Sequence, residues 1–136
     1  NNIELFKQMR ARNTNLTLQV CCTVNIFNVY YLSAIADWIY KQDFDFVYWN
    51  MLHDAPWLSI AHLPNYAKTS IANYLNTQLF PAEYQAEIKK IVEFMNLGTS
   101  STGDELLKNI RQLDQRRNQS LKHVEPELAK ILNYED

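Results

Sequence analysis

Polar side chains that could bind a ligand follow two β-rich segments in the first half of the sequence. They are Thr23, Asn25, Asn28, Asn50, His53 and Asp54. In parallel α/β sheets, ligands bind just beyond the carboxyl ends of the strands. If the two segments are adjacent parallel strands, these side chains line one rim of the sheet, which is the candidate ligand site. A local interpretation stays open, in which Asn28 caps the following helix and Asn25 belongs to a turn.

Catalytic and metal chemistry have little support in the sequence. His53 followed by Asp54 could form an oriented imidazole, but no nucleophile stands beside this pair. The histidines lack the i, i+4 spacing of a helical metal site. Cys21 and Cys22 are adjacent, so on a strand they would point to opposite faces and could share neither a metal nor a disulfide. We expect two reduced core thiols and no metal.

One basic stretch, KNIRQLDQRRNQSLK over residues 108–122, could contact phosphates. Acidic residues flank it, and no aromatic side chains interleave with it for base stacking, so a solvated helix face is the simpler interpretation. The net charge of the 136 residues is −2, and no apolar run approaches the length needed to cross a bilayer. We therefore expect neither nucleic acid nor a membrane as a partner.

Glycine is scarce, with only Gly98 and Gly103, both in one late loop. A phosphate-binding loop needs several glycines, so the sequence predicts no nucleotide-binding loop. The sequence starts with Asn-Asn, without an initiator methionine, and enters a helical pattern at once. This start favours a piece of a longer protein, although a trimmed chain would look the same. Reduced cysteines and the lack of a basic, apolar leader predict a cytoplasmic location.

Two strands joined by a helix make up the expected first part of the fold. After a short amphipathic helix over residues 3–12, residues 16–24 alternate in polarity and are rich in β-formers. Residues 29–41 follow helical spacing, and residues 43–50 are apolar on both faces, as in a buried parallel strand. The helix between the strands is long enough for a right-handed crossover.

The second half is predicted to be helical. The helical segments are residues 65–79, 81–97, 104–113 and a short one after Pro126. The predicted fold class is α/β: two parallel strands with a crossover helix, followed by a mainly α-helical C-terminal part. We place a boundary near Pro64. Residues 1–64 are then an α-β-α-β fragment and residues 65–136 the helical part, and we expect the two to share one core.

The order of these elements resembles the late barrel of radical S-adenosylmethionine (SAM) proteins. The resemblance rests on the segments LQVCCTVNIFN, VYYLSAIADWIYKQ, FDFVYWNMLHDAP and LPNYAK. In particular, the chain is similar to the twitch-domain-containing group encoded by marine viruses and their bacterial hosts. The C-terminal end of this group is also similar to a segment of the chain, NIRQLDQRRNQSLKHVEPELAKIL. TVNIFN before a helix is similar to the fifth strand and turn of such barrels. The resemblance covers essentially the whole chain.

This family implies a partial (β/α)6 barrel with a 4Fe-4S cluster and S-adenosylmethionine at the carboxyl ends of the strands. By this resemblance, Thr23, Asn25 and Asn28 match the end of the fifth strand. Asn50 and His53 match the end of the sixth, near the adenosine or the substrate. The sequence departs from the family because it lacks the Cys-x3-Cys-x2-Cys cluster motif and the glycine-rich methionine-binding segment. We therefore expect no cofactor in this chain alone; SAM and the cluster would need a missing N-terminal half.

Two functions from different classes stay open at this point. In the first, the chain is the C-terminal fragment of a radical SAM enzyme, not catalytically competent alone, and its partner is the missing N-terminal barrel half. In the second, it is a stand-alone α/β interaction module, homodimeric and without a cofactor, that self-associates through open strand edges. The many aromatic residues suit a surface that meets a partner under both interpretations.

Overall fold

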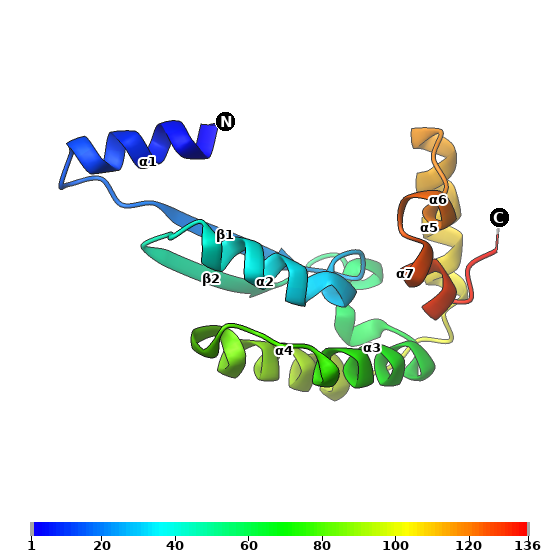
Figure 1. The fold of residues 1–136 in the computed structure, drawn as a ribbon. Coiled ribbons are helices and arrows are strands. Elements are labelled where there is room, and N and C mark those ends of the chain that lie inside the picture. Colours follow the sequence, from blue (N-terminus) through cyan, green and yellow to red (C-terminus); the bar gives the residue numbers. More distant parts are fainter. Residues whose placement is uncertain (1, 136) are drawn as a thin grey trace.

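The structure is a computed structural model that describes residues 2–135. Its helices and strands are, in order, α1 Asn2–Arg12, β1 Gln19–Val24, α2 Leu32–Lys41, β2 Phe46–Met51, α3 Asn65–Thr77, α4 Gln85–Leu97, α5 Asp104–Arg117, α6 Leu121–Val124 and α7 Pro126–Ile131. Short 3₁₀ turns precede α2 and α4, and two more follow β2 (Figure 1). The fold is mixed α/β and mostly helical, which confirms the coarser part of the predicted fold class.

The two strands form a parallel sheet, and α2 is the crossover between them. In their register, Cys21 lies opposite Tyr48 and Thr23 lies opposite Asn50. Both strands begin later than predicted. β2 is delayed because Asp43 adopts a left-handed backbone conformation with φ of 54°, which places it in the turn after α2 and not in the strand.

One face of the sheet is covered and the other is bare. The covered face carries Val20, Cys22, Val24, Val47, Trp49 and Met51, which pack into the hydrophobic core. On this face the indole of Trp49 meets the ring of Tyr84, in the turn before α4, with ring centroids 5.6 Å apart. On the opposite face, the side chains of Phe46 and Tyr48 are 52% and 55% exposed. The expectation that this strand is buried on both faces is therefore wrong for this chain, because helices cover only one side.

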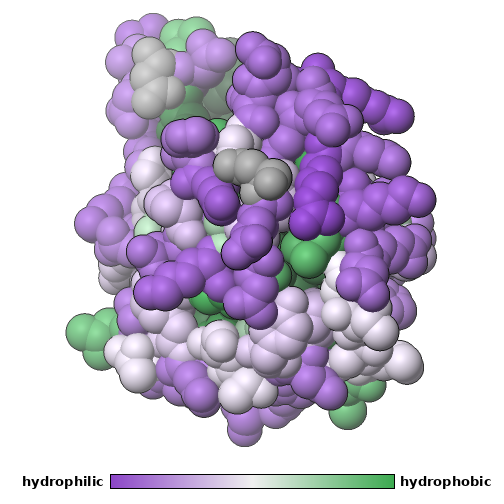
Figure 2. Space-filling model, turned by 90° about the vertical axis from the view of Figure 1, so that its right-hand side faces the viewer, coloured by the Kyte–Doolittle hydropathy of each residue, from purple (hydrophilic) through white to green (hydrophobic). Residues whose placement is uncertain are grey.

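A single cluster of buried side chains draws on both halves of the chain. It includes Val24, Leu32 and Ile39 from the first half, and Ile71, Ile91, Ile110 and Leu128 from the helices of the second. Figure 1 shows α5, α6 and α7 standing beyond the carboxyl ends of the strands. The face of the molecule on that side is mostly hydrophilic, with apolar residues in small areas near its middle and at its edges (Figure 2). The boundary near Pro64 stays a prediction.

A buried lysine joins three segments near the carboxyl end of the sheet. Lys68 of α3 is only 3% exposed, and its Nζ donates to the carbonyl oxygens of Ala61 at 2.6 Å and Gly98 at 2.9 Å. Gly98 ends α4, as predicted, and lies so close to Ala61 that a Cβ at this position would overlap it. Burial lowers the pKa of Lys68, and the two carbonyl acceptors stabilise this polar group inside the core.

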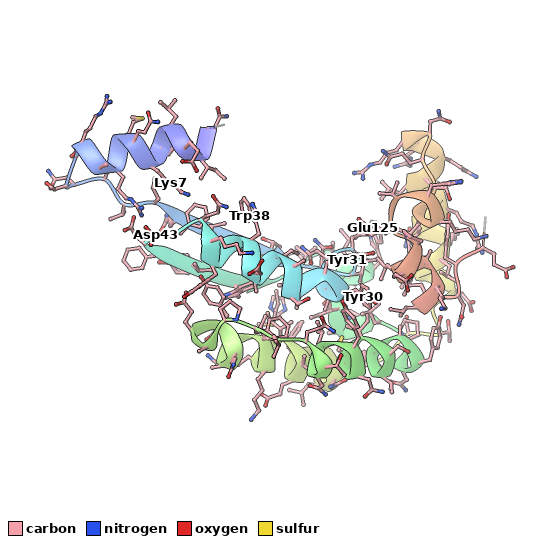
Figure 3. All side chains as sticks on the ribbon, in the orientation of Figure 1. Lys7, Tyr30, Tyr31, Trp38, Asp43 and Glu125 are labelled. Carbon is pink, nitrogen blue, oxygen red and sulfur yellow. The ribbon has the colours of Figure 1, made fainter. Side chains whose placement is uncertain are left out.

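Polar contacts hold α1 to the rest of the chain. None of the side chains described for α1 is buried. Arg10 donates to the backbone carbonyl of Asp43 at 2.8 Å and to the carboxylates of Asp43 and Asp45 at 3.1 and 3.0 Å. Figure 3 shows Lys7 reaching from α1 toward the turn that holds Asp43. Three large apolar side chains of α1 are exposed: Leu5, Phe6 and Met9.

We expect Lys68→Met to lower the free energy of unfolding by about 2 kcal/mol, because the carbonyl groups of Ala61 and Gly98 lose their donor while the apolar stem is kept. Urea denaturation followed by circular dichroism measures this loss. The matched control is Lys89→Met, because Lys89 is an exposed lysine on α4 with one ion pair of 3.9 Å. It should change stability by less than about 0.5 kcal/mol. Equal unfolding midpoints for the two variants would contradict the role given to Lys68.

The attachment of α1 should weaken in acid. The carboxylate of Asp45 accepts from the backbone N–H of Leu18 at 2.7 Å and from Arg10, and these bonds lower the pKa of Asp45 below its ordinary value of 3.8. Because the pKa of Asp45 is lowered, its charged carboxylate stabilises the attached state of α1 when the pH is above the ordinary pKa. This stabilisation is lost as the pH falls through the pKa that Asp45 has in the folded protein. We expect the Leu18 amide resonance to titrate with a midpoint below 3.8, and the Asp45→Asn variant to abolish that titration. A midpoint at or above 3.8 would show that the bonds do not form.

Candidate functional site

The turn after β1 uses the side chains of both its asparagines. Asn28 Oδ1 accepts from the backbone N–H of Asn25 at 2.9 Å, and Asn28 Nδ2 donates to the carbonyl of Thr23 at 2.9 Å. Asn25 Oδ1 accepts from the backbone N–H of Phe27 at 2.9 Å. Asn28 occupies the N-cap position of the 3₁₀ turn Val29–Tyr31, as expected, but its side chain makes no capping hydrogen bond there. The turn interpretation of Asn25 is confirmed.

The other rim candidates lie in different surroundings. Thr23 and Asn50 are neighbours across the strands and lie on the bare face at its carboxyl end. The imidazole of His53 packs edge-on against the ring of Phe94 in α4, with centroids 4.9 Å apart. Asp54 is exposed in the segment that follows. The structure thus brings Thr23 and Asn50 together on the sheet, whereas His53 contacts a helix.

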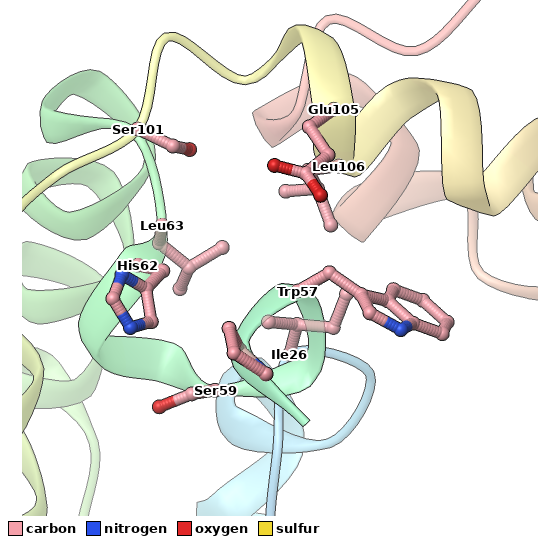
Figure 4. A pocket seen from close by; sticks show the side chains of 9 residues that line it. Ile26, Trp57, Ser59, His62, Leu63, Ser101, Glu105 and Leu106 are labelled. Atoms are coloured by element: carbon pink, nitrogen blue, oxygen red, sulfur yellow. The ribbon is translucent and has the colours of Figure 1, made fainter. Parts of the chain in front are cut away.

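A cavity of about 90 Å³ opens beyond the carboxyl ends of both strands. Its walls come from the turn after β1, the 3₁₀ segment after β2 and the start of α5. They include Ile26, Trp57, His62, Leu63, Ser101 and Glu105. Figure 4 shows the carboxylate of Glu105 extending toward the middle of this space, with the Ser101 hydroxyl on one side and Trp57 on another. The end of a parallel sheet is where ligands usually bind, so this cavity is a second candidate site.

Backbone contacts hold the walls of the cavity in place. The N–H of Ser101 donates to the carbonyl of His62 at 3.2 Å, which ties the loop before α5 to the segment after β2. The N–H of Ile26 donates to the carbonyl of Leu58 at 3.0 Å, which ties the turn after β1 to the same segment. Gly103, just before α5, has φ of 95°, a left-handed conformation that favours glycine. The turn after β1, the segment after β2 and the loop before α5 are therefore held together around the cavity.

Sequence reasoning missed this cavity because its polar residues are far apart in the chain. His62 lies in the irregular segment, and Ser101 and Glu105 lie around the start of a late helix. No spacing rule links such positions. The available signal was the placement of both glycines in the loop that forms part of the wall, since Gly98 packs against Ala61 and Gly103 needs a left-handed backbone.

Metal ligands do not converge in the described part of the chain. Within residues 2–135, no group of three or more His, Cys, Asp or Glu side chains could hold a metal ion. None of the helices in this range is long and apolar enough to cross a membrane. The lack of a cofactor and the cytoplasmic location both stay predictions.

Comparisons with protein-family models, with curated proteins and with solved structures found no match to this chain. The resemblance to radical SAM proteins therefore stays a prediction, and the geometry of the sheet and of the cavity must carry the functional argument.

The two cysteines lie on opposite faces of β1, as predicted. Cys21 is exposed on the bare face, whereas Cys22 is half-buried on the covered face, so only one of them is a core thiol. The expectation of two core thiols is corrected on this point. Burial raises the pKa of Cys22 to about 11.

This difference predicts selective alkylation. Two variants each keep one cysteine: Cys22→Ser keeps Cys21, and Cys21→Ser keeps Cys22. At mildly alkaline pH, iodoacetamide should alkylate Cys21 at least roughly ten-fold faster than Cys22. The reason is that the thiolate is the reacting form, and that Cys22 is shielded. Mass spectrometry of timed samples measures both rates. Unfolding in urea is the control and should make the rates similar. Equal rates in the folded variants would contradict the assignment of the two faces.

Proposed function

We propose that this chain is the C-terminal part of a radical SAM-like barrel, in which further parallel strands complete its sheet. The supporting observation is a parallel sheet with one bare face. Sheets made only of parallel strands are almost always covered on both faces. Here the side chains of Phe46 and Tyr48 are more than half exposed. Two-stranded sheets also leave an unpaired edge on each strand, and such edges are commonly paired or covered.

The two faces of the sheet suit the two sides of a barrel wall. In a barrel, side chains along each strand alternate between the interior and the surrounding helices. The covered face packs on helices in this chain, so the bare face would line the interior. Thr23 and Asn50 lie at the carboxyl end of that face, which is where barrel enzymes bind their substrates. We therefore assign these two residues to the substrate side of the completed site.

The radical chemistry would depend on the strands that are not part of this chain. Cys21 and Cys22 are the only cysteines, and their side chains point to opposite faces of one strand. A 4Fe-4S cluster is held by several converging thiolates, so it would be bound elsewhere, together with SAM. The contribution of this chain would be to close the barrel and to contact the substrate. Alone, it would be catalytically inactive.

Self-association is a second candidate, and one feature of the bare face favours it. The side chains of that face are all uncharged: Gln19, Cys21, Thr23, Phe46, Tyr48 and Asn50. In a two-fold symmetric contact a patch meets its own copy, so any charge near the axis would face a like charge. An uncharged face avoids this repulsion, and the open strand edges could pair with those of a second copy. This candidate needs no cofactor.

The coding sequence upstream of the Asn1 codon decides between the two candidates. We expect an open reading frame that encodes further strand–helix units and a Cys-x3-Cys-x2-Cys motif. When the extended chain is produced whole, Cys21 should be alkylated at least roughly ten-fold more slowly than in the 136-residue chain, because the bare face becomes the barrel interior. A start codon a few residues before Asn1 would contradict the barrel and leave self-association as the candidate.

A further inference from the structure

The cavity beyond the strand ends combines apolar walls with a single carboxylate. Ile26, Leu63 and Leu106 are buried and form much of its lining. Glu105 extends into the space from the first turn of α5 (Figure 4). Glu105 takes part in no ion pair with another residue between positions 2 and 135. A carboxylate beside apolar walls attracts a cation that also has an apolar part.

The polar groups around the cavity match the donors of an ammonium group. A primary ammonium has three N–H donors and no acceptor. Glu105 offers carboxylate oxygens and Ser101 offers its hydroxyl oxygen. Ser101 Oγ already accepts from the N–H of Gly103 at 3.2 Å and has a second lone pair for a ligand. The indole of Trp57 adds an aromatic wall, which favours a cation further.

The size of the cavity limits the ligand to a small group. Its volume is about 90 Å³. A water molecule occupies about 30 Å³ in the liquid, so the space suits an ammonium with a short carbon chain. Sites that enclose drug-sized ligands have volumes of about 300–1,000 Å³, so this cavity is too small to enclose such a ligand.

We infer that this cavity binds a primary alkylammonium group, with Glu105 as its counter-ion and Ser101 as a further acceptor. A small anion would be repelled by the carboxylate. A divalent metal ion would need several oxygen ligands, and the cavity offers one carboxylate. The alkylammonium could belong to a free amine or to a lysine side chain of a peptide, since both present the same chemistry. This site does not depend on completion of the sheet.

The test is a titration of the ¹⁵N-labelled 136-residue chain with n-propylammonium chloride, followed by NMR. We expect saturable shifts of the Trp57 indole N–H and the Ser101 amide. n-Propanol at the same concentrations, with sodium chloride to match ionic strength, should leave both resonances unchanged. Glu105→Gln should weaken binding roughly ten-fold or more, because the charge-assisted bond is lost while the shape is kept. The matched control is Glu127→Gln, since Glu127 is an exposed acid on α7, and it should bind like the unmodified chain.

Nα-acetyl-lysine amide distinguishes the two sources of the ammonium. Binding as tight as that of n-propylammonium would assign the site to a lysine side chain, whereas binding of n-propylammonium alone would assign it to a free amine. Three results would overturn the inference: no saturable shift at Trp57, equal shifts with n-propanol, or unchanged affinity in Glu105→Gln. We expect the Glu105→Gln variant to fold, because Glu105 is exposed and its replacement removes no core contact. The amide spectrum of the variant checks this directly.

Discussion

The bonds that Lys68 makes inside the core fix the geometry on which the rest of the structure depends. Its ammonium joins the segment after β2 to the end of α4, at the carbonyl groups of Ala61 and Gly98. A buried lysine is costly unless its donors are satisfied, so these carbonyl groups must stay where they are. Gly98 packs so closely against Ala61 that no Cβ would fit at this position. The loop that follows Gly98 carries Ser101 and leads to Glu105, and both residues line the cavity.

The sheet and the helices differ in how their apolar side chains are covered. The helices have a continuous core, and their apolar side chains are buried on each other and on one side of the strands. The other side of the sheet has no such cover, and neither do Leu5, Phe6 and Met9 of α1. A face with exposed aromatic rings, beside open strand edges, is typical of a surface that meets more polypeptide. The carboxyl end of the sheet therefore combines two features: a bare face with Thr23 and Asn50, and a small cavity lined by Glu105.

Local patterns predicted the elements of this fold well, because they depend on neighbouring residues. Alternation and β-branched residues located β1, helical spacing located α2 to α5, and the scarcity of glycine marked the loop before α5. The same patterns failed where tertiary context decides. Apolar residues on both faces of β2 predicted burial, but the pattern cannot say which side has a neighbour. Lys68 looked like any polar residue on a helix, because only packing places its Nζ between two carbonyl groups.

Some residues of the candidate site could also be predicted from local patterns, and others could not. Thr23 and Asn50 were predictable as neighbours, because adjacent parallel strands end at one edge. The hydrogen bonds of Asn28 were not, since its side chain closes a turn with Asn25 instead of capping a helix. The polar residues of the cavity could not be predicted together, because they lie on three segments that are far apart in the sequence and meet only in the folded chain.

Hydrogen exchange of the strand amides, measured on the chain at a concentration where sedimentation shows a monomer, tests most directly whether the sheet is unfinished. In a two-stranded parallel sheet, alternate amides point into the ladder and the others point outward from the edge. We predict slow exchange for the amides of Gln19–Val24 and Phe46–Met51 that lie in the ladder, and fast exchange for those that face outward. Slow exchange for both sets in the monomer would contradict this, because the edges would then be covered within the chain itself.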